Sequence, residues 1–218
     1  MTAQSDAGIT VMGIAGRRGN RTEAIAEALA DAARRVALYY GVRGESASVL
    51  NEGSGNLDYF QDFDYKLDLL NNVENYVGAL VFDKDKDILE KSGVVFVRTQ
   101  YPGVSLPSYK SVVTEDGTPD WVKNYSINIP GYLTSVSFSK NRGSPQKTYQ
   151  SSYESAIASL LPQLSTRMGN EVVDVSEGKL TYNYSVSSGI LENVIILETW
   201  ADKKTGAIWT LLVARQKL

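Results

Sequence analysis

The chain has 218 residues, of which 43% are hydrophobic and 22% are charged, and its formal net charge at pH 7 is −3. This length fits one large domain or two small ones, and the composition is typical of a globular protein with a packed core. There is no basic excess, so we expect no binding to nucleic acid. The longest apolar runs are well short of the ~18 residues that a membrane-spanning helix needs. The first ten residues have neither the charged nor the apolar part of a signal peptide, so we expect none in this chain.

Two residue types are absent from the sequence, which contains no cysteine and no histidine. Without cysteine there is no disulfide, no thiolate nucleophile and no cysteine-ligated metal. Without histidine the usual general base near neutral pH and the commonest transition-metal ligand are both missing. We therefore expect a protein that is not an enzyme and that binds no cofactor and no metal. An enzyme that works with carboxylates is the least favoured alternative.

The first half of the chain predicts a strand, a helix and then further strands. The strand is expected at 9–15 and the helix at 21–40, where small residues recur at helical spacing and would let the helix axis approach a sheet closely. Asn20 followed by Glu23 predicts a capping box at the start of the helix. Strict alternation of apolar and polar residues over 63–69 predicts a half-buried strand.

A long hairpin is expected to close the first half. Residues 76–82 and 94–97 are apolar at both alternating positions, and strands of this kind are covered on both faces. The segment "DKDKD" at 83–87 resembles the start of a calcium loop. However, its sixth position is Ile88 instead of glycine and its twelfth is Val94 instead of glutamate, so an exposed hairpin tip is the better interpretation.

The second half predicts the same elements after a proline-rich segment. Residues 101–131 hold four of the six prolines and are interpreted as a connector. A strand is expected at 132–139, and a helix begins at Pro145 with Ser144 as its N-cap and ends or kinks at Pro162. A strand at 180–186 and a hairpin over 190–216, with its turn at 202–206, complete this half.

The correspondence between the halves predicts a tandem duplication. Matched positions include Gly19 with Gly143 and Ala32 with Ala156 in the helices, and Phe82 with Trp200 and Gly93 with Gly206 in the hairpins. The predicted fold class is α+β, with two copies of a strand–helix–multistrand unit in which one helix packs on an antiparallel sheet. The predicted boundaries are 1–104 for the first repeat, 105–131 for the connector and 132–218 for the second repeat. Because one helix covers one sheet face, we expect the copies to cover each other's second face as a pseudo-dimer, or that face to meet a partner.

Three further groups of residues are candidates for function. The stretch "GIAGRRGNRTEA" at 13–24 lacks the spacing of a dinucleotide fingerprint and is interpreted as a plain turn from strand to helix. Asp62, Asp64 and Asp68 are interpreted as the solvated face of a strand that discourages edge-to-edge pairing. Trp200 and Trp209 are expected to lie near each other across the last hairpin and to belong to the core.

An alternative function uses the cleft that is expected between the two repeats. Aromatic side chains on the strands would line this cleft and hold a small molecule. The candidate binding residues are Tyr65, Tyr182 and Tyr184, together with Leu67.

The stretch "TPDWVKNYSINIPGYLTSVSFSKNRGSPQKTYQSSYESAIASLL" resembles the LPP-twenty lipoprotein family and the related flagellar outer-membrane lipoproteins. The resemblance rests on Pro119, Trp121 and Val122, a short strand, a helix with Ala156 and Ala158, and the closing hairpin. It implies a dodecin-like α+β fold and a structural or assembly role in the bacterial cell envelope, without catalysis. It also implies a location in the periplasm or at the outer membrane, and partners that are other envelope proteins or further copies of the chain. The lipid-bearing cysteine of the family is not present in this chain, so membrane attachment would depend on an anchor outside it.

Overall fold

The computed structural model is an α+β protein with two antiparallel sheets, as the sequence predicted. It describes residues 8–16, 19–53, 61–91, 93–104, 106–125, 127–140, 142–175 and 178–217. At 49–53, 61–63, 167, 169–175 and 178–184 the description covers the backbone alone. No helix among the described residues is both long enough and apolar enough to cross a membrane.

The smaller sheet has three strands, in the order β1 (Ile9–Gly16), β5 (Val94–Tyr101) and β4 (Ile88–Lys91). Helix α1 (Arg21–Tyr40) packs against it, and the predicted stripe of small residues is the buried face. These buried residues are Ala24, Ala28, Ala32, Ala33, Val36, Ala37 and Leu38. The approach is closest at Gly13 of β1, where a Cβ atom would lie 1.9 Å from the carbonyl oxygen of Ala28.

The start of α1 is capped, though by a different contact from the one predicted. The side chain of Asn20 accepts a hydrogen bond from the Thr22 backbone N–H at 2.9 Å. Glu23 accepts a hydrogen bond from the Asn20 side chain, at 3.3 Å, instead of from the Asn20 backbone. Asn20 is therefore the N-cap of α1, as the sequence indicated, but its side chain bonds the Thr22 N–H.

The predicted strand at 76–82 is wrong. The segment begins with a short helix, α2 (Glu74–Val77), and keeps a single bridge between Val81 and Gln100. The side chain of Asn72 accepts a hydrogen bond from the Glu74 N–H at 3.0 Å, which favours a turn at this point over a strand. Val81 is 63% exposed, so this segment is not covered on both faces.

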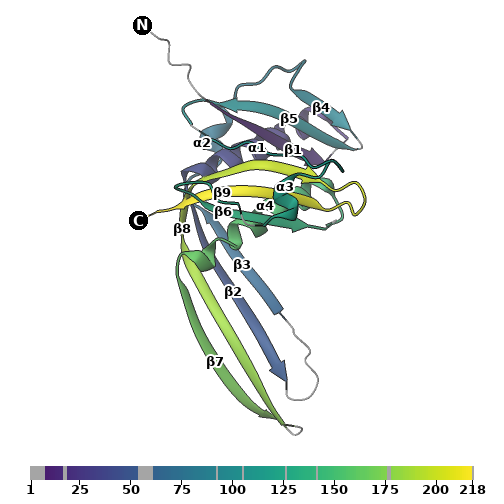
Figure 1. Cartoon of the computed structure of the whole chain (residues 1–218). Coiled ribbons are helices and arrows are strands. Elements are labelled where there is room, and N and C mark those ends of the chain that lie inside the picture. The colour runs from purple at the N-terminus through teal and green to yellow at the C-terminus, as the bar shows by residue number, and fades with distance from the viewer. Residues whose placement is uncertain are drawn as a thin grey trace.

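The larger sheet has the order β3-β2-β8-β9-β6, and β7 pairs with the first part of β8. Its strands are β2 (Val42–Gly53), β3 (Gln61–Leu69), β6 (Leu133–Ser139), β7 (Thr166–Val175), β8 (Gly178–Ala201) and β9 (Ile208–Gln216). The pairing of β2 with β8 joins the first half of the chain to the second. The strands β3, β2, β8 and β7 extend away from the rest of the molecule as a four-stranded arm (Figure 1).

Helix α4 (Pro145–Ala158) packs on β6 and β9. Its N-cap is Ser144, whose side chain accepts from the Lys147 N–H at 3.2 Å, and its first residue is Pro145, as predicted. The helix ends at Ala158 and is followed by the 3-10 turn η1 (Leu161–Gln163), which contains Pro162.

The connector forms part of the core. Its short helix α3 (Asp120–Lys123) buries Trp121 and Val122 against Leu211 of β9, and Ile129 packs against Ile195 and Val213. The connector therefore covers the face of β8 and β9 opposite α4, where the sequence predicts either the other repeat or a partner.

The two halves share an order of elements. Each has a strand, a helix and a hairpin, and in each the last strand pairs with the first, β5 with β1 and β9 with β6. The hairpin of the first half is β2–β3 and that of the second half is β7–β8. In the arm, whose order is β3-β2-β8-β7, the first strand of one hairpin (β2) pairs with the second strand of the other (β8). A twofold axis that exchanged β2 with β7 and β3 with β8 would not reproduce this order.

Candidate functional site

Two strand edges that no other strand covers face the same space. β1 is the end strand of the smaller sheet, and the last part of β8, from Glu192 to Ala201, pairs with β9 on one side alone within the described residues. In Figure 1 β1 and this part of β8 run in the same direction with their edges toward each other. Unpaired strand edges present rows of backbone donors and acceptors.

A cleft of about 520 Å³ lies between these two edges. Its walls are unbroken runs of residues, Gly8–Met12 on one side and Val194–Thr199 on the other. A strand face would contribute alternate residues, since successive side chains point to opposite faces. The continuous runs therefore indicate that the strand edges themselves line the cleft.

The direction of the backbone donors on β1 can be read from two hydrogen bonds. Ile14 N–H donates to Oδ2 of Asp31 at 3.0 Å, and Gly16 N–H donates to Oε1 of Gln146 at 3.2 Å. Both donors therefore point away from β5. The β1–β5 register is continuous from Ile9 to Gly16, so the N–H of Met12 points the same way.

The wall formed by β8 is irregular. Its register against β9 shifts between Glu192 and Ile195 and again between Ile196 and Glu198. Asn193 has a φ of 51°, which is the left-handed region that asparagine tolerates better than most residues. Bulges of this kind bend a strand and are over-represented next to binding sites.

The floor of the cleft is formed by the two long helices. α1 contributes Arg35 and Leu38, and α4 contributes Tyr149, whose ring makes an edge-to-face contact with Phe96 at 6.4 Å between centroids. Burial raises the pKa of the Tyr149 phenol. The floor is thus mostly apolar, with Arg35 as its cationic group.

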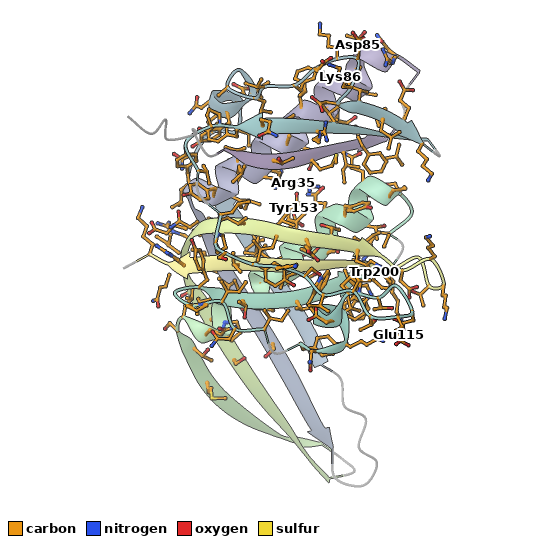
Figure 2. All side chains as sticks on the ribbon, turned by 45° about the horizontal axis from the view of Figure 1, so that its top comes forward. Arg35, Asp85, Lys86, Glu115, Tyr153 and Trp200 are labelled. Carbon is orange, nitrogen blue, oxygen red and sulfur yellow. The ribbon has the colours of Figure 1, made fainter. Side chains whose placement is uncertain are left out.

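Arg35 lies between α1 and α4, with its side chain 10% exposed (Figure 2). Its Nη2 is 3.1 Å from Oδ2 of Asp31, and its Cζ is 5.2 Å from the centroid of the Tyr153 ring. Its Nε is buried and has no hydrogen-bond partner among the residues that the structure describes. An arginine has five N–H donors, and buried donors are usually hydrogen-bonded. This guanidinium therefore makes fewer hydrogen bonds than a buried arginine usually does.

Three neighbouring groups bear on the charge of the cleft. The Tyr153 phenol is neutral at physiological pH and burial raises its pKa further, and its hydroxyl also has no hydrogen-bond partner among the described residues. Glu198 lines the cleft, but its Oε2 accepts a hydrogen bond from Nε1 of Trp121 at 2.6 Å and so is directed toward the connector. Asp31 is shared between Arg35 and the β1 backbone.

Of the predicted binding tyrosines, Tyr65 is on β3 in the arm and is not among the residues that line the cleft. The side chains of Tyr182 and Tyr184 are outside the described residues. A binding site formed by the three tyrosines therefore stays a prediction.

The remaining motifs have structural roles. In the segment 83–87, the N–H of Asp83 donates to the Asp87 carboxylate and the Asp87 carboxylate also accepts from Arg98, as expected for an exposed turn. The glycine-rich stretch at 13–24 holds Gly13 of β1 and the start of α1, while Arg17 and Arg18 are outside the described residues. Asp64 and Asp68 are exposed on β3, as predicted, and Asp62 is described by its backbone alone. Where the structure is described, no group of three or more acidic residues is arranged to hold a metal ion.

One pattern in the sequence does point to the floor of the cleft. Asp31 and Arg35 are four residues apart on the border of an otherwise alanine-rich stripe, which is the spacing of an ion pair within one helix. The two strand edges had no signal, because strand order depends on long-range pairing.

No protein-family model, no curated protein and no solved structure matches the chain, so the similarity to the LPP-twenty lipoproteins stays a prediction.

Proposed function

We propose that the protein binds an extended segment of another protein between the edges of β1 and β8. The observation that carries this proposal is the cleft whose two walls are strand edges without a neighbouring strand. An extended segment laid on such an edge gains backbone hydrogen bonds, and pockets for its alternate side chains give selectivity.

The parallel direction of the two edges supports this mode of binding. Because β1 and β8 run the same way, one inserted strand would be antiparallel to both (Figure 1). It would join the two sheets in the order β4-β5-β1-segment-β8-β9-β6. The apolar floor of α1 and α4 would cover one face of that segment.

This mode agrees with a non-catalytic role in which the protein acts through contacts with other proteins. The absence of cysteine and histidine supports the non-catalytic part. The resemblance to envelope lipoproteins supports a structural or assembly role in the periplasm or at the outer membrane, with envelope proteins or other copies of the chain as partners. The shared order of elements supports an origin by tandem duplication, with the cleft lying between a strand of the first half and a strand of the second. Superposition of residues 9–100 on 132–216 stays the test of that origin.

A second candidate is a small apolar ligand in the same cleft. The volume of about 520 Å³ lies within the range of small-molecule sites, and most lining side chains are apolar. This candidate predicts that the backbone donors of the β1 edge contribute little to binding.

Replacing Met12 with proline separates the two candidates. Proline removes the outward N–H at the free edge and leaves the hydrogen bonds between β1 and β5 in place, so the fold should tolerate it. Met12→Ala is the matched control, since it removes the same 39%-exposed side chain and keeps the donor. The assay measures capture of a displayed library of random twelve-residue segments by the purified full chain.

We expect Met12→Ala to capture the segments selected on the wild type. Met12→Pro should weaken capture about fivefold or more, the equivalent of at least one lost hydrogen bond. Equal capture by the proline variant, or no captured segment at all, would overturn the proposal. Stoichiometric binding of the apolar dye anilinonaphthalene sulfonate by the folded chain would then favour the small-molecule site.

A further inference from the structure

The floor of the cleft holds a buried cation that the fold uses incompletely. Arg35 is nine-tenths buried, forms one ion-pair contact with Asp31 and leaves Nε without an acceptor. A buried donor without a partner has a free-energy cost, and each such group in a folded protein calls for an explanation. The Tyr153 ring that Arg35 faces supplies no hydrogen bond, because its hydroxyl is also without a partner.

The other charges near the cleft leave this position favourable to an anion. Asp31 is already bound by Arg35 and by the Ile14 N–H. Glu198, the acidic residue in the β8 wall, is held by Trp121 on the connector side. Tyr153 and Tyr149 are neutral near pH 7, as phenols ordinarily are, and burial raises the pKa of each further.

We infer that Arg35 selects segments that carry a carboxylate, which the guanidinium binds at the floor of the cleft. This inference rests on the proposed function, because it names the chemistry of the segment that lies between β1 and β8. A carboxylate matches the planar fork of a guanidinium, and a hydrogen bond between two charged groups is stronger than a neutral one, particularly away from water. The carboxylate comes either from an aspartate or glutamate side chain or from the C-terminus of the segment.

Two libraries distinguish these sources. One displays random twelve-residue segments with a free C-terminus, and the other displays them between two flexible linkers. Selection on the wild-type chain should enrich aspartate or glutamate at one position in the linker-flanked library, or should succeed in the free-end library alone.

The matched variants change Arg35 without leaving a buried charge that has no partner of opposite sign. Arg35→Gln combined with Asp31→Asn removes both charges, keeps the net charge of the chain and preserves an acceptor for the Ile14 N–H. Arg35→Lys keeps the positive charge and loses the planar guanidinium that can bind a carboxylate through two hydrogen bonds. The urea midpoint of each variant shows whether it is folded before it is used for selection.

We expect the double variant to lose the preference for a carboxylate, with capture of the acidic segments weakened about tenfold or more, and Arg35→Lys to keep part of it. The inference would be overturned if the segments selected on the wild type carried no carboxylate, or if the double variant selected acidic segments to the same degree. In either case a loss of capture in Met12→Pro would show that the cleft still binds segments through the β1 edge. If the wild type selects no segment from either library, both the inference and the proposed function fail.

Discussion

At the residue scale, Gly13 determines how closely α1 approaches the smaller sheet. A Cβ atom at this position would lie 1.9 Å from the backbone oxygen of Ala28 and 3.1 Å from the Cβ of Ala32. Backbone cannot yield as a flexible side chain does, so Gly13→Ala should destabilise the fold by ~1–3 kcal/mol or more. Gly19→Ala is the control, because nothing lies within 4 Å of its added Cβ, and its effect should stay within ~0.5 kcal/mol. Urea unfolding of both variants measures the difference, and equal midpoints would contradict the packing described for β1.

The raised pKa of Tyr101 predicts that the stability of the fold changes with pH in the alkaline range. Burial, together with a 3.0 Å hydrogen bond to the Tyr40 hydroxyl, raises the pKa of Tyr101 to about 12. The folded state therefore holds this proton more tightly than the unfolded chain, whose tyrosine has a pKa of about 10. The contribution of this group to stability is complete below about pH 10 and declines as the pH rises from there toward 12.

Comparison with Tyr101→Phe isolates this effect from the other tyrosines. We expect the difference in unfolding free energy between the wild type and Tyr101→Phe to be constant from pH 8 to 9 and to shrink by pH 11. A difference that does not change over this range would show that the Tyr101 hydroxyl is not protected in the fold.

At the scale of elements, the connector should behave as part of the core. Trp121 is 0% exposed, packs with Val122 and Leu211, and donates to Glu198. Trp121→Ala should cost ~3–5 kcal/mol, the value for truncating a buried aromatic residue. Tyr125 of the same segment is 65% exposed and its ring centroid lies 6.0 Å from that of Trp209, so Tyr125→Ala is the control with an expected effect below ~1.5 kcal/mol. Chemical denaturation decides between this description and a loose linker, which would give two variants of equal stability.

In the last hairpin Trp200 lies directly opposite Trp209, so the two tryptophans are near each other as predicted. Both are half-buried instead of fully buried. They pack against the buried cluster of Trp121, Val122 and Leu211, and the Trp209 ring also stacks at 4.6 Å on Phe138, which is exposed. The two tryptophans therefore contact the core, as predicted, but they are not fully buried in it.

Local patterns account for the elements that the sequence predicted well. The alanine stripe of α1, the Ser144-Pro145 start of α4 and the 202–206 turn each depend on neighbours in sequence. The segment 76–82 has the apolar pattern of a strand, but the hydrogen bond from the Glu74 N–H to the Asn72 side chain favours a turn there. A cleft between the halves was expected, but its walls could not be predicted, since they are defined by which strands remain unpaired, and that depends on the pairing of β2 with β8 across the whole chain.

At the scale of the whole molecule, the shared sheet predicts one cooperative unfolding transition. All three tryptophans, at 121, 200 and 209, lie in the second half of the chain, whereas far-UV circular dichroism reports on both halves. Because β2 pairs with β8 over twelve positions, the two signals should give the same midpoint. The Gly13→Ala change in the first half should lower the tryptophan midpoint by the same amount as the dichroism midpoint. Separate midpoints would mean that the halves fold as independent units.

The length of β8 gives the arm and the cleft a common mechanical element. Its 24 residues have a contour of roughly 80 Å at about 3.3 Å per residue, and one continuous backbone forms the middle of the arm and then a wall of the cleft. The bulges that begin at Glu192 lie where the pairing with β2 ends at Leu191, so they form the joint between the two parts. A load applied to the arm would be carried along this strand to the joint, and tilting the arm would alter the width of the cleft.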